Sequence, residues 1–451
     1  MVYNPDSIYI NGMSPKELAS AVLTDVYGEA SPSIPIDPFL LMRKYDIIYQ
    51  FLNFKDLEGI YLVPEDEHDI ALVGINYNRP ITRQRFTAAH ELCHHIKDRQ
   101  NETCLINSKN EIEKFAERFA AELLMPRELF YSEAKKYMKN GKISLDDALL
   151  LSEEFGVSFN SCARRLAYTF RILDTDYSTL NRDITNYKPN KKKIELGIDP
   201  ENVNLLCQAI DSYQFFYKVS PDIVWYSFKN EFIYNENRME GLDIEPEEVA
   251  EIMADLRLNG QNSLYCTECY EDIIQVIGHS DIYEYMLHTS DTISIYKLLD
   301  LNKKLFQFAP FPENAGKTRT DNNLVLGSKF ETVDWKDVAT ELIKLQEPVE
   351  KLIADKDNTK VSDYLRTALK IHHRITQIHP FRDGNGRCSR ALLNWMLRLN
   401  NLPPIYFKAS EKDLYYDALK IADTDKNYNM LLKVTIKALF KTIMTVHRIQ
   451  D

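Results

Sequence analysis

Residues 379–390 bring together side chains that could bind a phosphate and move a proton. They read His-Pro-Phe-Arg-Asp-Gly-Asn-Gly-Arg-Cys-Ser-Arg. The run supplies a histidine base, a carboxylate, two glycines that free the backbone to wrap an anion, and two arginines three residues apart. Guanidinium groups at that spacing lie on one face of a helical turn and can grip phosphate oxygens. The pattern therefore predicts a phosphate site with its own general base.

Two helices should flank this run. Residues 361–378 place apolar side chains at helical spacing, and Pro380 cannot continue a helix, so His379 should lie at the helix end. The apolar run 391–397 predicts a second helix after the glycines. Consecutive N–H groups at its start, together with the helix dipole, would bind an anion. Asp383 is a hard oxygen ligand suited to Mg²⁺, which would leave the histidine to take a proton from an attacking hydroxyl.

The string resembles the Fic signature, His-Pro-Phe-x-Asp/Glu-Gly-Asn-Gly-Arg-x-x-Arg, at every fixed position. Fic proteins mostly transfer AMP from ATP to a hydroxyl of a target protein. The resemblance therefore implies Mg²⁺ and ATP, and a partner protein that presents a Tyr, Thr or Ser hydroxyl. The roles it implies are His379 as general base, Asp383 as Mg²⁺ ligand, Gly384, Asn385 and Gly386 as the cradle of the α- and β-phosphates, Arg387 and Arg390 as grips on the distal phosphates, and Phe381 as the anchor of the loop.

Two further segments fit this resemblance. Residues 319–330 lack helical periodicity and resemble the Fic flap, a β-hairpin that aligns the target hydroxyl by strand addition. A predicted helix near residues 232–250 contains a segment similar to the inhibitory motif Ser/Thr-x-x-x-Glu-Gly/Asn. By that resemblance Glu240 pairs with Arg390 and takes the place of a γ-phosphate oxygen. Glu236 stands where the family has serine or threonine, and its charge should oppose that of the glutamate one turn later.

A second set of chemical groups lies in the first third of the chain. His90 and His94, spaced i and i+4, present two imidazoles on one helical face, and Glu91 between them can act on metal-bound water. This H-E-x-x-H pattern is typical of zinc sites. A second helical run follows, and a carboxylate from it can complete three protein ligands. Glu113 and Glu117 are both open as that third ligand.

The residues around this motif resemble the ImmA/IrrE family of zinc metallopeptidases. The resemblance covers roughly residues 15–170 and includes Arg-Phe-Thr-x-Ala-His-Glu-Leu-x-His and Phe-Ala-x-x-Leu-Leu-Met-Pro. It implies His90, His94 and Glu113 as ligands of Zn²⁺ and Glu91 as the general base. Cleavage of a peptide or repressor is the activity implied, and a zinc site that senses without cleaving is the alternative.

Length and composition fit more than one domain. A chain of 451 residues is too long for one ordinary domain, and 44% hydrophobic with 27% charged residues is a globular composition. The patterns predict the zinc domain over residues 1–180, a polar, basic linker over 181–200 and the Fic domain over 201–451. Residues 142–170 suggest two short helices around a Phe-Gly-Val-Ser turn that pack on the zinc domain rather than bind DNA.

Charge and cysteine content limit the expected class of partner and the expected cellular compartment. The 55 basic and 67 acidic residues give a net charge of −12, which argues against nucleic acid or an anionic membrane as the main partner. No stretch is long and apolar enough to cross a bilayer, and no signal-peptide pattern opens the chain. Seven cysteines without framework spacing fit a reducing cytoplasm. Fic domains often form dimers, so a homo-oligomer is a further expectation.

Together these patterns predict a multidomain α+β protein, with an N-terminal zincin-like α/β metallopeptidase domain and a C-terminal all-α Fic domain that carries a β-hairpin flap. The expected function is an autoinhibited protein adenylyltransferase coupled to a zinc metallopeptidase or sensor domain, of toxin or stress-response type. Two alternatives stay open. In one, the Fic domain removes AMP or transfers another phosphate-containing group. In the other, a zinc metallopeptidase carries a Fic domain that only senses nucleotide.

Overall fold

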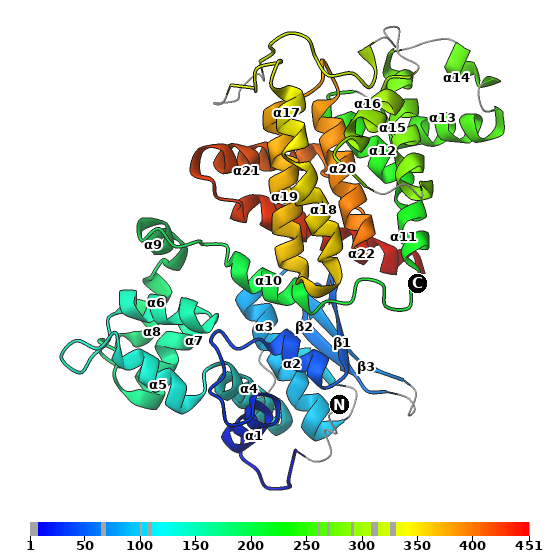
Figure 1. Ribbon diagram of the computed structural model, residues 1–451. Coiled ribbons are helices and arrows are strands. Elements are labelled where there is room, and N and C mark those ends of the chain that lie inside the picture. Colours follow the sequence, from blue (N-terminus) through cyan, green and yellow to red (C-terminus); the bar gives the residue numbers. More distant parts are fainter. Residues whose placement is uncertain are drawn as a thin grey trace. The chain divides into compact units, whose positions relative to one another are not determined.

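The computed structural model describes residues 8–64, 69–99, 102–105, 110–242, 244–259, 262–267, 271–289, 293–307, 314–324 and 331–450. The chain divides into two compact units, Met1–Gln214 and Phe215–Asp451 (Figure 1). The first unit combines helices with a small sheet, and the second is helical, so the predicted α+β class is confirmed. Within the described ranges, no helix is long and apolar enough to span a membrane.

A four-stranded sheet with the order β1-β3-β2-β4 frames the first unit. β1 (Ile47–Leu52) pairs parallel with β3 (Ala71–Asn76), whereas β2 (Leu57–Leu62) pairs antiparallel with β3 and with β4 (Glu102–Leu105). The first three strands are rich in apolar and aromatic residues, as strands usually are, whereas the fourth is short and mostly polar. Helix α3 (Ile81–Cys93) packs on β2 and β3, so the sheet supports the helix that carries the paired histidines.

Short polar residues cap the first two helices of this unit. Ser14 and Glu17 form a reciprocal capping box at the first helix, and the carboxylate of Asp37 accepts two N–H groups at the start of the second. The helices are α1 (Pro15–Tyr27), α2 (Pro38–Lys44), α3 with a π-helical extension (His94–Asp98), α4 (Glu111–Leu124), α5 (Arg127–Lys135), α6 (Leu145–Phe155), α7 (Phe159–Arg164) with a π-helical extension (Arg165–Phe170), α8 (Leu180–Asn186), α9 (Pro189–Glu195) and α10 (Val203–Asp211).

The residues predicted to be a linker, 181–200, form helices. They contain most of α8 and all of α9, and they belong to the first compact unit. Lys193 is buried and pairs with Glu153 at 2.8 Å. A lysine of this basic stretch therefore forms an ion pair within a folded unit. The domain limits set out from the sequence remain a prediction.

Arg85 lies fully buried within the first unit and ties together three segments that are distant in sequence. Its Nε donates to the carbonyl of Gly156 at 3.0 Å, Nη2 donates to the carbonyl of Ile36 at 2.5 Å, and Nη1 donates to Gln208 Oε1. Burial lowers the pKa of Arg85 to about 10, although the nearby Asp37 carboxylate opposes that shift. Helix α3 is thereby fixed to the segment before α2, to the turn after α6 and to α10.

Two long helices, α19 (Val361–Ile378) and α20 (Asn385–Leu399), pack against each other in the second unit. Both lie where the sequence predicts them. The remaining helices of this unit are α11 (Pro221–Ser227), α12 (Lys229–Met239), α13 (Pro246–Asn259), α14 (Leu264–Thr267), α15 (Glu271–His288), α16 (Lys297–Leu305), α17 (Val338–Ile343), α18 (Gln346–Ala354), α21 (Lys412–Asp425) and α22 (Asn429–Gln450).

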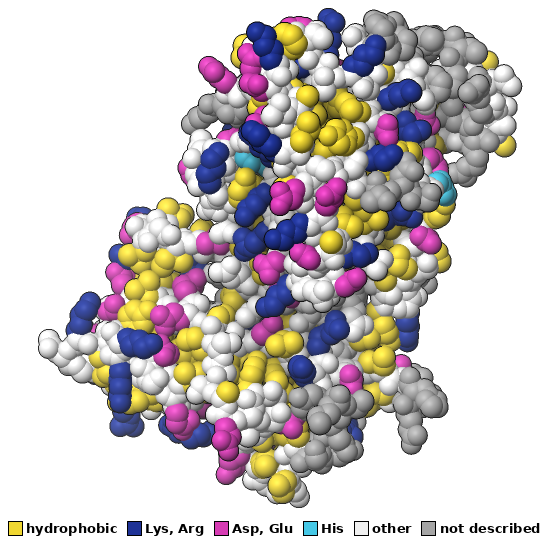
Figure 2. Space-filling model, in the orientation of Figure 1, with side chains coloured by type: hydrophobic (Ala, Val, Ile, Leu, Met, Phe, Trp, Pro, Cys, Tyr) yellow, Lys and Arg dark blue, Asp and Glu magenta, His cyan; other side chains and the backbone are white. Residues whose placement is uncertain are grey.

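The molecular surface carries mixed charge. On the face shown in Figure 2, Lys and Arg side chains are interspersed with Asp and Glu side chains. With 67 acidic and 55 basic residues, the chain as a whole carries more negative than positive charge.

The substitution Arg85→Met should destabilise the first unit by about 3 kcal/mol, because it leaves buried acceptors without a donor. Urea unfolding followed by far-UV circular dichroism should show an earlier transition. All three tryptophans, Trp225, Trp335 and Trp395, lie in the second unit, so their fluorescence transition should keep its midpoint. Arg118→Met changes an exposed arginine and is the matched control. An unchanged dichroism midpoint would contradict the role assigned to Arg85.

Candidate functional site

Helices α3 and α4 bring three metal-type side chains together. His90 Nε2 lies 3.1 Å from His94 Nε2, and the Glu113 carboxylate lies 3.2 Å from the first nitrogen and 3.4 Å from the second. All three residues are buried, and their ligand atoms lie within 4.8 Å of one another. Zinc ligands about 2 Å from a tetrahedral ion are roughly 3.4 Å apart. The donor set and its spacing therefore fit a zinc ion with a fourth position left for water.

Of the two candidate third ligands, Glu113 faces the histidines and Glu117 is exposed. Burial would raise the pKa of Glu113, but hydrogen bonds with His90 and His94 outweigh burial and lower that pKa to about 2. Glu113 is therefore a charged acceptor within the cluster, and the geometry favours it over Glu117.

This cluster is held in position by two residues that the sequence did not single out. Asp98 Oδ2 lies 2.9 Å from His94 Nδ1, which orients the imidazole with Nε2 toward the other ligands. Gly59 on β2 lies against α3, where an added Cβ would fall 2.5 Å from Thr87 Cγ2 and 2.7 Å from Glu91 Oε1. Only glycine leaves room for the Glu91 carboxylate at this approach. The i, i+4 spacing of Asp98 could have identified it, whereas Gly59 has no local signal.

His95, which follows His94 directly, is buried. Its Nδ1 lies 3.1 Å from the Tyr61 hydroxyl, and the two rings meet edge to face. This contact holds the π-helical extension of α3 against β2.

The loop between α19 and α20 holds the second set of chemical groups. His379 ends α19 with a φ of +51°, and Phe381 is buried beneath the loop. Gly384 has a φ of +80°, and an added Cβ there would meet the Phe306 and Leu305 side chains at 2.7 and 2.8 Å. The N–H groups in the first turn of α20 have no acceptor within the helix, so they can receive an anion.

The His379 ring is neutral near pH 7. Burial lowers its pKa to about 4, Arg319 adds to this shift, and Asp383 opposes it. Side-chain amide nitrogens of Asn323 and Asn385 lie 2.8 and 3.3 Å from Nδ1. Because both amides donate, Nδ1 accepts and Nε2 carries the ring hydrogen. Asn323 is a further residue that sequence reasoning missed.

The predicted flap, residues 319–330, begins at an anchored residue. Arg319 donates from its backbone N–H to the carbonyl of Pro380 at 2.9 Å and from Nε to the carbonyl of His379 at 2.8 Å. Residues 325–330 lie outside the described residues, so the hairpin itself stays a prediction. The start of the segment is nevertheless tied to the loop that carries the base.

Arg387 and Asp383 pair at the start of α20. Arg387 is buried, its Nη2 donates to Asp383 Oδ1 at 2.9 Å, and its guanidinium lies over the Phe306 ring. The Asp383 side chain is 62% exposed. Its carboxylate can therefore reach a hydrated Mg²⁺ ion, which proteins usually hold through one or two carboxylates together with substrate phosphates.

Arg390, buried on α20, is held by two glutamates at the end of α12. Its Nε donates to both carboxylate oxygens of Glu236, at 2.8 and 3.1 Å, and Nη2 donates to Glu240 Oε1 at 2.7 Å. Burial raises the pKa of Glu236, which Arg390 offsets only in part. Burial also opposes ionisation of Glu240, but Arg390 and Arg387 outweigh it and lower the pKa. The repulsion expected between the two glutamates is thus offset because they share one guanidinium.

Two family models match separate parts of the chain. The IrrE N-terminal-like domain matches residues 47–167, and the Fic/DOC family matches residues 292–397. The chain carries an IrrE-type domain followed by a Fic domain. The first match includes the histidine cluster and the second includes the loop between α19 and α20, whereas Glu240 precedes the Fic match.

Several curated relatives are protein adenylyltransferases. The fic-1 protein of Caenorhabditis briggsae is 32% identical over 131 residues, 29% of this chain and 24% of the relative. The fic-1 protein of Caenorhabditis elegans is 30% identical over 133 residues, 30% of this chain and 25% of the relative. The Fic protein of Culex quinquefasciatus is 41% identical over 59 residues, 13% of this chain and 12% of the relative. The chain thus spans a quarter or less of the length of these relatives.

Solved structures of Fic proteins align more loosely. Fic-1 from C. elegans aligns with a TM-score of 0.41 at 18% identity, covering 72% of this chain and 93% of that one. A Fic-domain signalling protein from Bacteroides thetaiotaomicron aligns with a TM-score of 0.40 at 20% identity, covering 53% of this chain and 93% of that one.

The IrrE-type domain should bind about one zinc ion per chain, because three protein ligands complete a site of this kind. Plasma mass spectrometry after dialysis should find the metal in the wild-type protein and lose it with His90→Ala. Asp98→Asn should weaken zinc binding by about 10- to 100-fold, since it releases the orientation of His94. Glu113→Gln should lower occupancy and Glu117→Gln should not. The reverse result for the two glutamates would contradict this ligand set.

Proposed function

We propose that the Fic domain transfers AMP from Mg²⁺-ATP to a Tyr, Thr or Ser hydroxyl of a target protein, and that α12 holds it inactive. The observation that supports this most directly is the loop between α19 and α20, where a neutral histidine adjoins an anion-binding helix start. Similarity to curated adenylyltransferases supports the choice of AMP as the group transferred.

The chemistry needs one base and a fixed polyphosphate. As the hydroxyl oxygen bonds to the α-phosphorus, its proton passes to His379 Nδ1, the bond from that phosphorus to the bridging oxygen breaks, and pyrophosphate leaves. Because the Asn323 amide donates to Nδ1 at rest, the target hydroxyl takes the place of that amide. Asn323 belongs to the predicted flap, so docking of a target on the flap can free the base.

Chain residues would hold the nucleotide around this base. The first-turn N–H groups of α20, from Asn385 and Gly386 onward, receive phosphate oxygens, and Arg387 stands beside them. Asp383 is the exposed carboxylate that would hold Mg²⁺, which neutralises charge on the phosphates.

Arg390 is the group that the proposed inhibition acts on. A distal phosphate needs its guanidinium, and at rest Glu236 and Glu240 occupy the donors. Each carboxylate–guanidinium bond contributes about 1.5 to 3 kcal/mol. Since Glu236 remains bound when Glu240 is removed, we expect the two carboxylates to inhibit jointly.

A second candidate function belongs to the IrrE-type domain. Glu91 lies between His90 and His94 on α3, and Gly59 leaves room for its carboxylate. Zinc bound by the cluster would lower the pKa of its water towards neutrality. Glu91 could then take the proton of that water while a peptide carbonyl is attacked, which is the metallopeptidase hypothesis with a peptide or repressor as substrate. A purely sensing role, and a toxin or stress role for the whole chain, stay expectations.

Labelling with α-labelled ATP and Mg²⁺ in a bacterial lysate tests the transferase. The wild-type protein should label weakly, Glu240→Gly about tenfold more, and Glu236→Ser with Glu240→Gly more again, because each change frees one face of Arg390. Adding His379→Ala to the double variant should abolish labelling.

Glu251→Ser, which changes an exposed glutamate of α13, is the matched control and should label like wild type. If the double variant labels no more than Glu240→Gly alone, Glu236 has no part in inhibition. If no variant labels, another donor, the reverse reaction or nucleotide sensing replaces AMP transfer.

The pH dependence should report the buried base. The pKa of His379 is lowered to about 4, so the ring binds a proton only below that value and is available as a base from pH 5 upward. In the Glu236→Ser, Glu240→Gly variant, kcat/KM for ATP should therefore stay level through about pH 6.5, where an ordinary histidine titrates, and fall only near pH 4. A fall in kcat/KM with an apparent pKa near 6.5 would contradict the buried, neutral base.

A further inference from the structure

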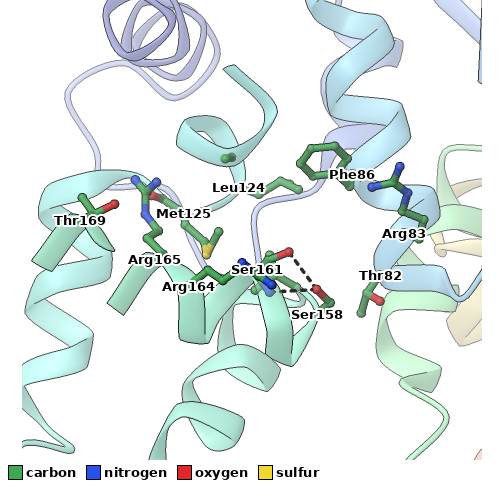
Figure 3. Close-up of a pocket in the computed structure, with 12 residues that line it drawn as sticks. Thr82, Arg83, Phe86, Leu124, Met125, Ser158, Ser161, Arg164, Arg165 and Thr169 are labelled. Atoms are coloured by element: carbon green, nitrogen blue, oxygen red, sulfur yellow. Dashed lines mark hydrogen bonds between the residues drawn. The ribbon is translucent and has the colours of Figure 1, made fainter. Parts of the chain in front are cut away.

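A pocket of about 340 Å³ lies in the first unit between α3, the end of α4 and the segment from α7 into its π-helical extension (Figure 3). Phe86, Leu124 and Met125 form an apolar wall. Arg83, Arg164 and Arg165 also line it, and none of its lining residues is acidic. The pocket therefore combines an apolar surface with three guanidinium groups.

The three arginines differ in what already satisfies them. Arg83 pairs with Glu58, and Arg165 pairs with Glu122 and donates to the carbonyl of Met125. Both of these carboxylates lie outside the pocket lining. Arg164 is exposed and has no ion pair with any residue that the structure describes. A ligand carboxylate could therefore pair with Arg164 without displacing an existing partner.

Arg165 offers a second point of attachment. The residue is 8% exposed, and its Nε is a buried donor without a hydrogen-bond acceptor in the described parts of the chain. Buried N–H groups normally have a hydrogen-bond acceptor, and a ligand in the pocket could supply one to Arg165. Ser158 and Ser161, which also line the pocket, bond to each other at 2.8 Å and add hydroxyls beside Arg164.

The pocket lies along the same helix pair as the histidine cluster. The Phe86 ring is 6.5 Å from the His90 ring, centroid to centroid. Arg83 precedes His90 by about two helical turns, roughly 11 Å. An extended peptide advances about 3.3 Å per residue, so a peptide on the cluster would place a side chain here roughly three residues from the bond at the cluster.

We propose that this pocket is a peptide-binding subsite that takes an acidic side chain next to an apolar one. The apolar wall receives the aliphatic side chain, and Arg164 with Arg165 receives the carboxylate. The assignment extends the proposed peptidase role, but binding needs no cleavage, so the two can fail separately.

The test is a titration of the full-length Glu91→Gln protein, labelled with ¹³C in its methionine methyl groups. The probe is N-acetyl-Leu-Glu-amide, and Met125, assigned with Met125→Leu, reports occupancy of the pocket. The Met125 signal should shift and saturate. N-acetyl-Leu-Gln-amide should bind about tenfold more weakly, because a charge-assisted bond is lost. Arg164→Glu should weaken binding of the acidic probe at least as much.

Arg182→Glu reverses the same charge at an exposed site on α8 and should leave binding unchanged. Equal affinity for the two probes, or equal effects of the two arginine variants, would overturn the subsite. Free 4-methylpentanoate that binds as tightly as the acidic dipeptide would make the pocket a small-molecule site and would overturn the peptide assignment. Longer peptides that carry Leu-Glu, incubated with the zinc-loaded wild-type protein, test cleavage separately. Binding that depends on Arg164 without any cleavage would keep the subsite and reject the peptidase.

Discussion

A guanidinium group that leaves water must find acceptors inside the protein, and this requirement organises the Fic domain around Arg390. The residue is 2% exposed, and both glutamates at the end of α12 turn toward it. One interaction therefore joins the helix that begins at the phosphate loop to the helix that precedes the Fic match. Removal of the arginine's partners would leave a buried charge, so the resting arrangement persists until another anion can replace them.

The same constraint explains how the other chemical groups are held in place. Arg85 meets backbone carbonyls at the start of α2 and after α6, and Arg319 meets carbonyls at the end of α19. In both cases a long side chain joins segments that are far apart in the sequence. Each helix that carries candidate site residues is thus positioned by a buried arginine one or two turns away, or across a loop, as well as by the sheet or bundle.

Much of the placement of the candidate site residues could be predicted because it is local. The i, i+4 spacing of His90 and His94 and the glycines after His379 specify geometry within a few residues, and the structure places both groups as that geometry requires. The contact between Gly59 and Glu91 could not be predicted, since β2 and α3 are separated by an intervening strand.

The same limit applies to β4 and to the end of α12. β4 is only four residues long and gives no alternating pattern. Repulsion between Glu236 and Glu240 was expected because helical spacing alone omits the arginine that the tertiary fold supplies.

The identity of residue 236 changes what kind of inhibition the site can exert. With a serine or threonine there, Arg390 would pair only with Glu240, and its Nε would be free of a carboxylate and could donate to a phosphate oxygen. With Glu236, three carboxylates (Asp383, Glu236 and Glu240) face the two guanidinium groups, so a nucleotide meets arginines whose donors are already bound. Inhibition in the proposed mechanism would then exclude the nucleotide as well as misplace it. Burial raises the pKa of Glu236, whereas Arg390 and Arg387 lower that of Glu240, so Glu236 holds its charge less firmly although it makes more bonds to the guanidinium.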